Sequence, residues 1–140
     1  MDTRIVRNLF KEKFGTEGML YFSPGRINLI GEHIDYCGGK VFPAALNLRT
    51  VIIARKNNQN VIRLAATTVP QHEELNISTL DAYKNLKWGD YQAGIAYVLQ
   101  NEGYKIVGCD TLYDTTVPFA SGLSSSASIE VATAMMFTTF

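Results

Sequence analysis

The chain has 140 residues, 46% hydrophobic and 19% charged, and its thirteen basic and thirteen acidic residues cancel. This composition is typical of one globular domain, and the balanced charge gives no support to a nucleic-acid or membrane-surface partner. No apolar run approaches the roughly 20 residues of a membrane span. The two cysteines form no disulfide or metal-ligand pattern, and the first residues lack the apolar core of a secretion signal, so we expect a cytoplasmic protein.

The first elements along the chain are predicted to be a helix and a short strand. The helix covers residues 3–14 and can be closed by Gly15. Its apolar face consists of four residues: Ile5, Val6, Leu9 and Phe10. Residues 18–22 indicate a strand, and the following Ser-Pro-Gly at residues 23–25 is a turn signal.

A strand-rich segment follows. Residues 41–46 are apolar and residues 50–55 are β-branched, so each stretch predicts a strand. The turn signal at residues 57–60 predicts a hairpin in which residues 61–65 pair back onto the preceding strand. Residues 67–81 are polar and without periodicity, which predicts irregular structure.

The last elements are predicted to be helix, strand and helix. Residues 91–101 have helical spacing with Asp90 as an N-cap, residues 107–117 suit a strand, and a second helix begins at Ser124. That helix ends without a cap or a polar tail, so we expect that more chain once followed. We also expect self-association through an uncovered sheet face or an uncovered apolar surface formed by three residues: Met135, Met136 and Phe140.

A run of small residues, Pro-Phe-Ala-Ser-Gly-Leu-Ser-Ser-Ser-Ala, occupies residues 118–127 between the predicted strand and the last helix. Small side chains let backbone N–H groups approach a phosphate, and a helix start adds unpaired donors and a favourable dipole. Serine hydroxyls can also bind phosphate oxygens or Mg²⁺. The run lacks the lysine of a P-loop, and on composition alone a serine-rich helix cap is an equally good interpretation.

Ionisable residues crowd between apolar ones in residues 25–36. Glu32 and Asp35, with His33 between them, offer groups that can hydrogen-bond to neighbouring hydroxyls of a sugar. Arg26 can stabilise a nucleophilic hydroxyl or a phosphate by charge-assisted bonds. The residue types alone favour a solvated turn with local ion pairs, and they match a metal-binding facial triad in composition only.

Taken together, these segments resemble the galactokinase branch of the superfamily that also holds the homoserine, mevalonate and phosphomevalonate kinases. Residues 23–46 resemble the galactokinase signature almost without a break, and residues 118–127 resemble the phosphate-binding loop of the superfamily. The spacing of Trp88, Tyr91 and Gly94 is similar to a segment near the adenine in galactokinases, although packing is the interpretation that these aromatic residues favour by themselves.

The resemblance implies an α+β fold, a mixed β-sheet with helices on one side, as in the amino-terminal domain of these kinases (GHMP kinases, related to domain 2 of a ribosomal protein). Residues 1–140 would form this domain incompletely, without the carboxy-terminal domain. The resemblance further implies transfer of the γ-phosphoryl group of ATP to the anomeric hydroxyl of galactose, with Mg²⁺.

Site roles follow from the same resemblance. Arg26 would stabilise charge during transfer, Trp88 and Tyr91 would lie near the adenine, and Ser126 would ligate Mg²⁺. The sugar hydroxyls would be held by Glu32, His33 and Asp35. The ATP phosphates would be bound by a continuous loop: Ala120, Ser121, Gly122, Leu123, Ser124, Ser125 and Ser126.

Departures from the family pattern predict that this chain alone is inactive. Family members are far longer, their catalytic aspartate lies beyond the second motif, and here no Asp or Glu follows Glu130. Cys37 stands where many galactokinases carry Asn. Two alternatives remain open: a non-catalytic module that binds galactose or ATP, and a kinase for a related sugar such as N-acetylgalactosamine. Mevalonate or homoserine is disfavoured, because Glu32 and Asp35 would repel their carboxylates.

Overall fold

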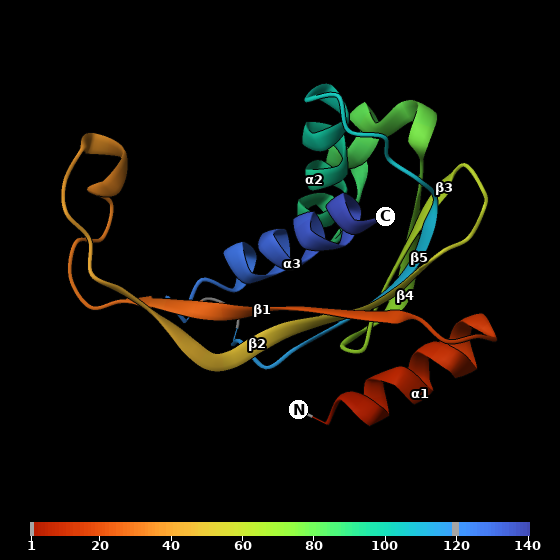
Figure 1. The fold of residues 1–140 in the computed structure, drawn as a ribbon, viewed down its shortest axis with the longest axis horizontal. Helices are drawn as coiled ribbons and strands as arrows, with labels where there is room; N and C mark the ends of the chain where they lie inside the picture. Colours follow the sequence, from red (N-terminus) through yellow and green to blue (C-terminus); the bar gives the residue numbers. More distant parts are fainter. Residues whose placement is uncertain (1, 119–120) are drawn as a thin grey trace.

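The fold is built on a five-stranded mixed sheet with helices against both faces (Figure 1). The computed structural model describes residues 2–118 and 121–140. The strand order is β1-β2-β5-β3-β4, in which only β3 and β5 pair in parallel among the described residues. The strands are β1 (Met19–Asn28), β2 (Pro43–Lys56), β3 (Val61–Ala66), β4 (Val69–Asn76) and β5 (Cys109–Thr115).

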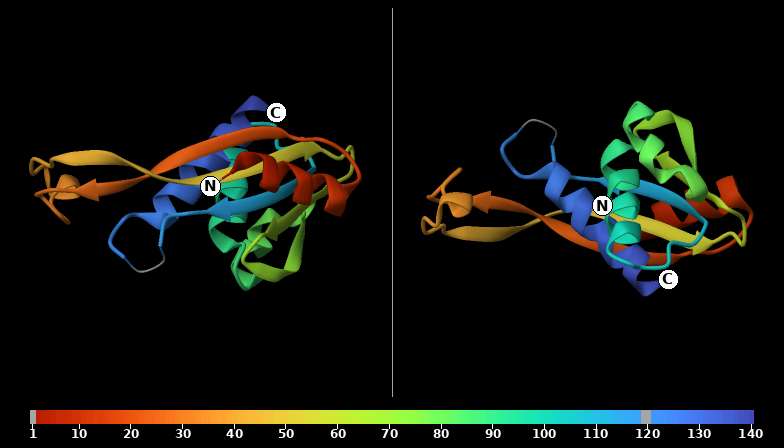
Figure 2. Two further views of the ribbon diagram at one scale, coloured as in Figure 1. Left: turned by 90° about the horizontal axis from the view of Figure 1, so that it is seen from below. Right: turned by 90° about the horizontal axis from the view of Figure 1, so that it is seen from above.

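In the described residues, three α-helices and two 3₁₀ helices complete the fold: α1 (Thr3–Phe14), η1 (Asp35–Cys37), η2 (Ile77–Asn85), α2 (Asp90–Asn101) and α3 (Ser125–Thr139). Figure 2 shows α1 in front of the sheet in one view and α2 and α3 in front of it in the opposite view. The predicted α+β fold with a mixed sheet is confirmed. Helices α2 and α3 share one side as predicted, and α1 in addition covers the opposite face. None of the helices in the described residues has the length and apolar character needed to cross a bilayer.

The core lies on both faces of the central strands. Along β2, Ile52 and Ala54 face the cluster under α2 and α3, whereas Val51 and Ile53 face the cluster under α1. Successive side chains of a strand point to opposite faces, so a strand covered on both sides needs a continuous apolar run. All four of these side chains are fully buried, which explains the unbroken Val-Ile-Ile-Ala sequence.

The predicted hairpin of residues 61–65 with the preceding strand is wrong. Strand β5 lies between β2 and β3, pairing antiparallel with the first and parallel with the second. The prediction of irregular structure for residues 67–81 is also wrong, because Val69–Asn76 forms the edge strand β4. Most of β4 is exposed, so its sequence lacks the alternation that marks a half-buried strand.

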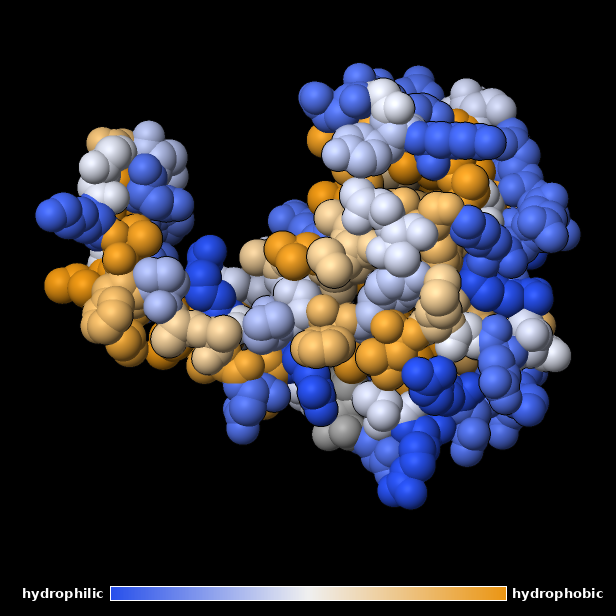
Figure 3. All heavy atoms as spheres, viewed as in Figure 1, coloured by the Kyte–Doolittle hydropathy of each residue, from blue (hydrophilic) through white to orange (hydrophobic). Residues whose placement is uncertain are grey.

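The β1–β2 pair extends beyond the sheet as a two-stranded arm, defined here as residues 26–45 (Figure 1). The predicted turn at residues 23–25 is wrong, because β1 continues through it with only a register shift between Pro24 and Arg26. The tip carries η1, and Figure 3 shows apolar side chains gathered on this projection. Three exposed examples are Ile30 at 72%, Phe42 at 62% and Leu29 at 59%.

Local sequence signals correctly predict both ends of α1. Helix α1 is capped by Asp2, whose side chain accepts a hydrogen bond from the Arg4 N–H, and ends at the left-handed Gly15 as predicted.

The three residues expected to form one uncovered apolar surface at the end of α3 differ in their burial. Met136 is fully buried, and the Phe140 ring packs edge-on against Tyr21 at 6.0 Å, whereas Met135 is exposed.

Candidate functional site

A cleft of about 420 Å³ lies where three sequence motifs meet. Its walls come from Glu32 on the arm, Tyr91 on α2, Pro118 and residues 121–126 before and at the start of α3, and Ile129 on α3. These segments are far apart in the sequence, and the strand order β1-β2-β5 brings them together by placing both the arm and the segment after β5 beside α3. Tertiary structure therefore assembles part of each predicted motif around one space.

Residues 121–126, here called the serine loop, present unpaired hydrogen-bonding groups to this cleft. Gly122 and Ser124 have left-handed backbone conformations, with φ of 73° and 55°. Ser124 is the N-cap of α3 but makes no capping hydrogen bond, so no side chain of its own satisfies the first N–H groups of the helix. The Ser125 hydroxyl oxygen is buried and has no partner among the described residues. Unpaired donors at a helix start form an anion site, and a partnerless buried hydroxyl fits a ligand there.

Strand β1 holds the serine loop in place. The Arg26 N–H donates to the Leu123 carbonyl at 3.1 Å, and a Cβ on Gly25 would lie only 3.0 Å from that oxygen. The buried Ser128 hydroxyl donates a hydrogen bond to the Ser23 carbonyl at 2.8 Å and accepts one from the Thr50 N–H at 3.2 Å. Sequence reasoning missed Ser128, whose only signal is its place in a serine-rich helix start.

The structure separates the three predicted sugar-binding residues. Glu32 lines the cleft, whereas His33 and Asp35 are exposed farther along the arm and are not part of its lining. The His33 ring packs edge-on against Tyr36, with 6.3 Å between ring centroids. Gly31 has a φ of 100°, and a Cβ there would lie 2.6 Å from the Lys40 carbonyl oxygen, so the turn that carries Glu32 requires glycine.

The start of α2 is held by Glu73 of β4. The Glu73 carboxylate accepts hydrogen bonds from the N–H groups of Lys87, Trp88 and Gly89, at 2.6, 3.3 and 2.7 Å. The prediction that Asp90 is the N-cap is wrong, because Asp90 is the first helical residue and a carboxylate from a distant strand satisfies these donors. No local sequence signal identifies Glu73 in this role.

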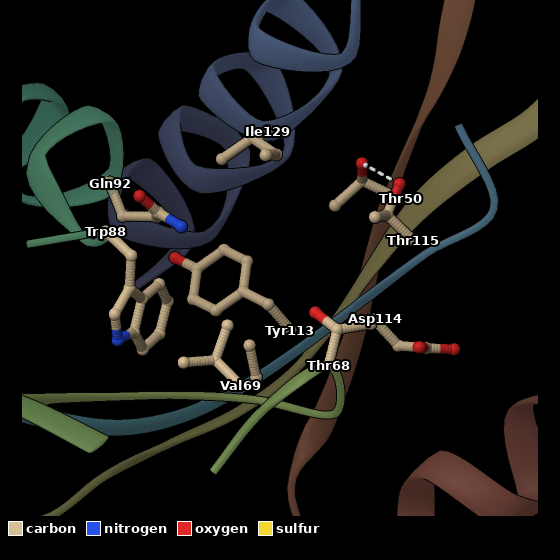
Figure 4. A pocket seen from close by; sticks show the side chains of 10 residues that line it. Thr50, Thr68, Val69, Trp88, Gln92, Tyr113, Asp114, Thr115 and Ile129 are labelled. Carbon is tan, nitrogen blue, oxygen red and sulfur yellow. Dashed lines mark hydrogen bonds between the residues drawn. The ribbon is translucent and has the colours of Figure 1, made fainter. Parts of the chain in front are cut away.

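Trp88 and Tyr91 line two different spaces, and Ile129 lines both. Tyr91 lines the cleft of the serine loop, whereas Trp88 lines a neighbouring cavity of about 100 Å³ together with Gln92 and Tyr113 (Figure 4). Ile129 belongs to the walls of both spaces, so the cavity and the cleft are adjacent. The Tyr113 hydroxyl lies 3.1 Å from the Thr133 hydroxyl, and burial raises the pKa of Tyr113 well above its ordinary range.

The chemistry of the cleft fits a nucleotide phosphate accompanied by a cation. Among the described residues, its lining contains no Lys or Arg, so phosphate charge would be met by backbone N–H groups, hydroxyls and a hard cation that prefers oxygen ligands. Ser126 is exposed at this point and offers such an oxygen. Ala120, also predicted to bind phosphate, lies outside the described residues. Within the described part of the chain, no three His, Cys, Asp or Glu side chains gather as a metal site.

Comparison with known proteins matches these features to one family. The galactokinase galactose-binding signature matches residues 8–56, and the amino-terminal domain of GHMP kinases matches residues 90–140. The chain is 47% identical over 137 residues to galactokinase of Clostridium tetani and 42% identical over 138 residues to that of Ligilactobacillus salivarius. These alignments cover 97% and 94% of the chain but only 35% of each relative, so the chain spans about a third of their length.

Solved structures agree with this match. The galactokinase of Lactococcus lactis, solved in complex with galactose, superposes with a TM-score of 0.82 at 37% identity over 94% of this chain and 35% of that one. Mevalonate kinase of Methanococcus jannaschii, at 23% identity, shares the fold with a TM-score of 0.75 over 91% of this chain and 41% of that one. Fold and site thus define the amino-terminal domain of a GHMP kinase. Within that superfamily the chain is similar, in sequence and in fold, to the amino-terminal portion of galactokinases.

Proposed function

We propose that this chain forms the amino-terminal part of the active site of an ATP-dependent galactokinase, which transfers the γ-phosphoryl group of ATP to the anomeric hydroxyl of galactose. The observation that carries the proposal is the convergence of Glu32, Tyr91 and the serine loop on one cleft. A sugar-binding carboxylate and a phosphate-binding loop in one space are what direct transfer between two substrates requires.

The serine loop would hold the ATP phosphates through the N–H groups at the start of α3 and the Ser125 hydroxyl, which has no other partner among the described residues. Ser126 would contribute an oxygen ligand to Mg²⁺, which when bound supplies the positive charge that the lining of this cleft lacks. The Trp88 cavity, adjacent through Ile129, would receive the adenine, and Tyr91 would lie between base and phosphates.

The arm would supply the sugar site. The carboxylates of Glu32 and Asp35 would accept hydrogen bonds from sugar hydroxyls, and His33 would add a further polar contact. Because His33 and Asp35 lie outside the lining of the cleft, the sugar would have to extend from Glu32 along the arm. Support for galactose comes from the match of residues 8–56 to the galactose-binding signature.

Arg26 would stabilise the charge that develops during transfer. Its backbone is bonded to Leu123, so the base of its exposed side chain lies beside the serine loop. A guanidinium there would favour negative charge on the attacking oxygen and on the transferred group. The resemblance places the catalytic aspartate downstream of the second motif, and no Asp or Glu follows Glu130. We therefore propose that this chain binds substrates without completing the transfer.

Thermal unfolding with galactose, with Mg²⁺-ATP and with both tests this proposal. At about 100 times the dissociation constant, a ligand that binds only the folded state adds about 2.7 kcal/mol to the free energy of unfolding. We expect each ligand to raise the melting temperature. Glu32→Gln should abolish the galactose shift alone, and Ser125→Ala should reduce the ATP shift alone. Glu12→Gln, an exposed change on α1, is the matched control.

The outcomes separate binding from catalysis. No shift with either ligand would contradict the proposal that these residues assemble a site. Shifts that survive both site variants would contradict the assigned residues. Release of ADP that depends on both ATP and galactose, by the purified chain, would contradict the proposed inactivity.

A further inference from the structure

A buried glutamine lines the cavity beside Trp88. Gln92, on the inner face of α2, is 4% exposed, and its Oε1 atom has no hydrogen-bond partner among the described residues. Figure 4 shows the Gln92 amide above the Trp88 indole and the Tyr113 ring, with its nitrogen turned towards Tyr113 and its oxygen on the other side of the amide. A buried polar group without a partner is destabilising, so it needs an explanation such as a ligand that supplies the missing donor.

The cavity has room and largely apolar walls for a heterocycle. Its volume of about 100 Å³ far exceeds the roughly 10 to 15 Å³ that holds one water molecule on the same measure. The indole of Trp88 and the side chains of Val69 and Ile129 provide an aromatic and apolar surface. Stacking on such a surface suits any base, so the walls alone do not select one base over another.

The polar groups of the cavity provide the selection. The Tyr113 hydroxyl is already within hydrogen-bond distance of Thr133, and the Trp88 indole N–H donates to the Gln71 carbonyl at 3.2 Å. Unlike these two groups, the Gln92 amide has a buried acceptor oxygen without a partner among the described residues. A glutamine amide matches adenine well, because its oxygen accepts from the exocyclic amino group while its nitrogen donates to a ring nitrogen.

We propose that Gln92 determines base specificity, with Oε1 accepting a hydrogen bond from the 6-amino group of adenine. The inference rests on the proposed function, since it requires a nucleotide whose phosphates occupy the serine loop. Ile129 forms part of both walls, so one extended ligand would place its phosphates in the cleft and its base against Gln92.

The fluorescence of Trp88, the only tryptophan, reports binding directly. The two probes are Mg²⁺-ATP and the Mg²⁺ complex of purine riboside triphosphate, which differs from ATP only in lacking the 6-amino group. We expect the wild-type chain to bind ATP about tenfold more tightly than the analogue. Gln92→Leu should reduce this ratio to about one, mainly by weakening ATP. Gln100→Leu, an exposed change on the same helix, should leave the ratio unchanged.

Stability provides an independent readout. Because Oε1 has no partner in the described part of the chain, Gln92→Leu should melt at the same temperature as the wild type or higher. A marked loss of stability would show that the amide has a structural partner, which would overturn the proposal. Equal affinities of the wild type for the two probes would overturn base recognition by Gln92 but leave the proposed function standing. No response to either probe would overturn both.

Discussion

The two halves of β2 differ in their surroundings more than in their sequence. Residues 50–54 are fully buried, whereas residues 43–45 are exposed, although both stretches are rich in apolar side chains. The buried half pairs with β1 and β5 and is covered by helices on both faces. The exposed half pairs only with β1, within the arm. Burial along one strand is thus set by what packs on it.

The same contrast separates stability from candidate function. A two-stranded ribbon without a packed face is at best marginally stable by itself, so the arm depends on the sheet that anchors it. Local opening should therefore be easiest in the arm. The proposed sugar-binding residues lie on this weakly held segment, whereas the serine loop is tied to the sheet through Arg26 and Ser128.

The largest difference between the two regions is expected for isoleucine truncation. Ile52→Ala removes a fully buried side chain from the sheet and should lower the free energy of unfolding by about 2 to 5 kcal/mol. Ile30→Ala removes a side chain that is 72% exposed on the arm and should change it by less than about 0.5 kcal/mol. Urea unfolding measures both values. Similar losses for the two variants would show that the arm packs on the domain.

A smaller difference in the loss of unfolding free energy is expected between an aspartate of the sheet and one of the arm. Asp110 is 1% exposed and accepts hydrogen bonds from Arg55 at 3.0 Å, Arg63 at 3.1 Å and Asn57 at 3.0 Å. Asp110→Ala should cost about 2 to 4 kcal/mol, less than for a fully buried network because both arginines reach solvent. Asp35→Ala, on the arm, should cost less than about 0.5 kcal/mol while removing the galactose-induced stabilisation. A neutral Asp110→Ala would contradict a structural role for this cluster.

The smallest perturbation is thiol labelling, which leaves the sequence unchanged. Cys37 is exposed on the arm, whereas Cys109 is buried. Burial raises the pKa of the Cys109 thiol, and the negative charge of Asp110 raises it further. We expect iodoacetamide to modify Cys37 quickly and Cys109 only after unfolding, as mass spectrometry can follow. Equal rates in the folded protein would contradict the burial of Cys109.

The raised pKa of Cys109 also predicts a pH dependence. A thiol that is harder to ionise when folded binds its proton more tightly in the native state. Its contribution to stability should be complete below the unfolded-state pKa of about 8.5 and decrease as the pH rises above it. Unfolding of Cys109→Ala at several alkaline pH values should show a weaker dependence than the wild type.

The sequence by itself determined the elements whose signals are local. The helix over residues 3–14 with Gly15, the helical spacing that became α2, and the strand before the serine-rich helix depend on neighbours within a few residues. The galactokinase motifs were also readable, because their residues are contiguous in the chain.

Tertiary structure alone decided which strands pair and which polar groups meet. The insertion of β5 between β2 and β3 and the hydrogen bonds from Glu73 to the backbone just before α2 depend on segments distant in sequence. The same is true of the convergence of Glu32, Tyr91 and the serine loop, because local residue patterns carry no information about contacts made across the fold.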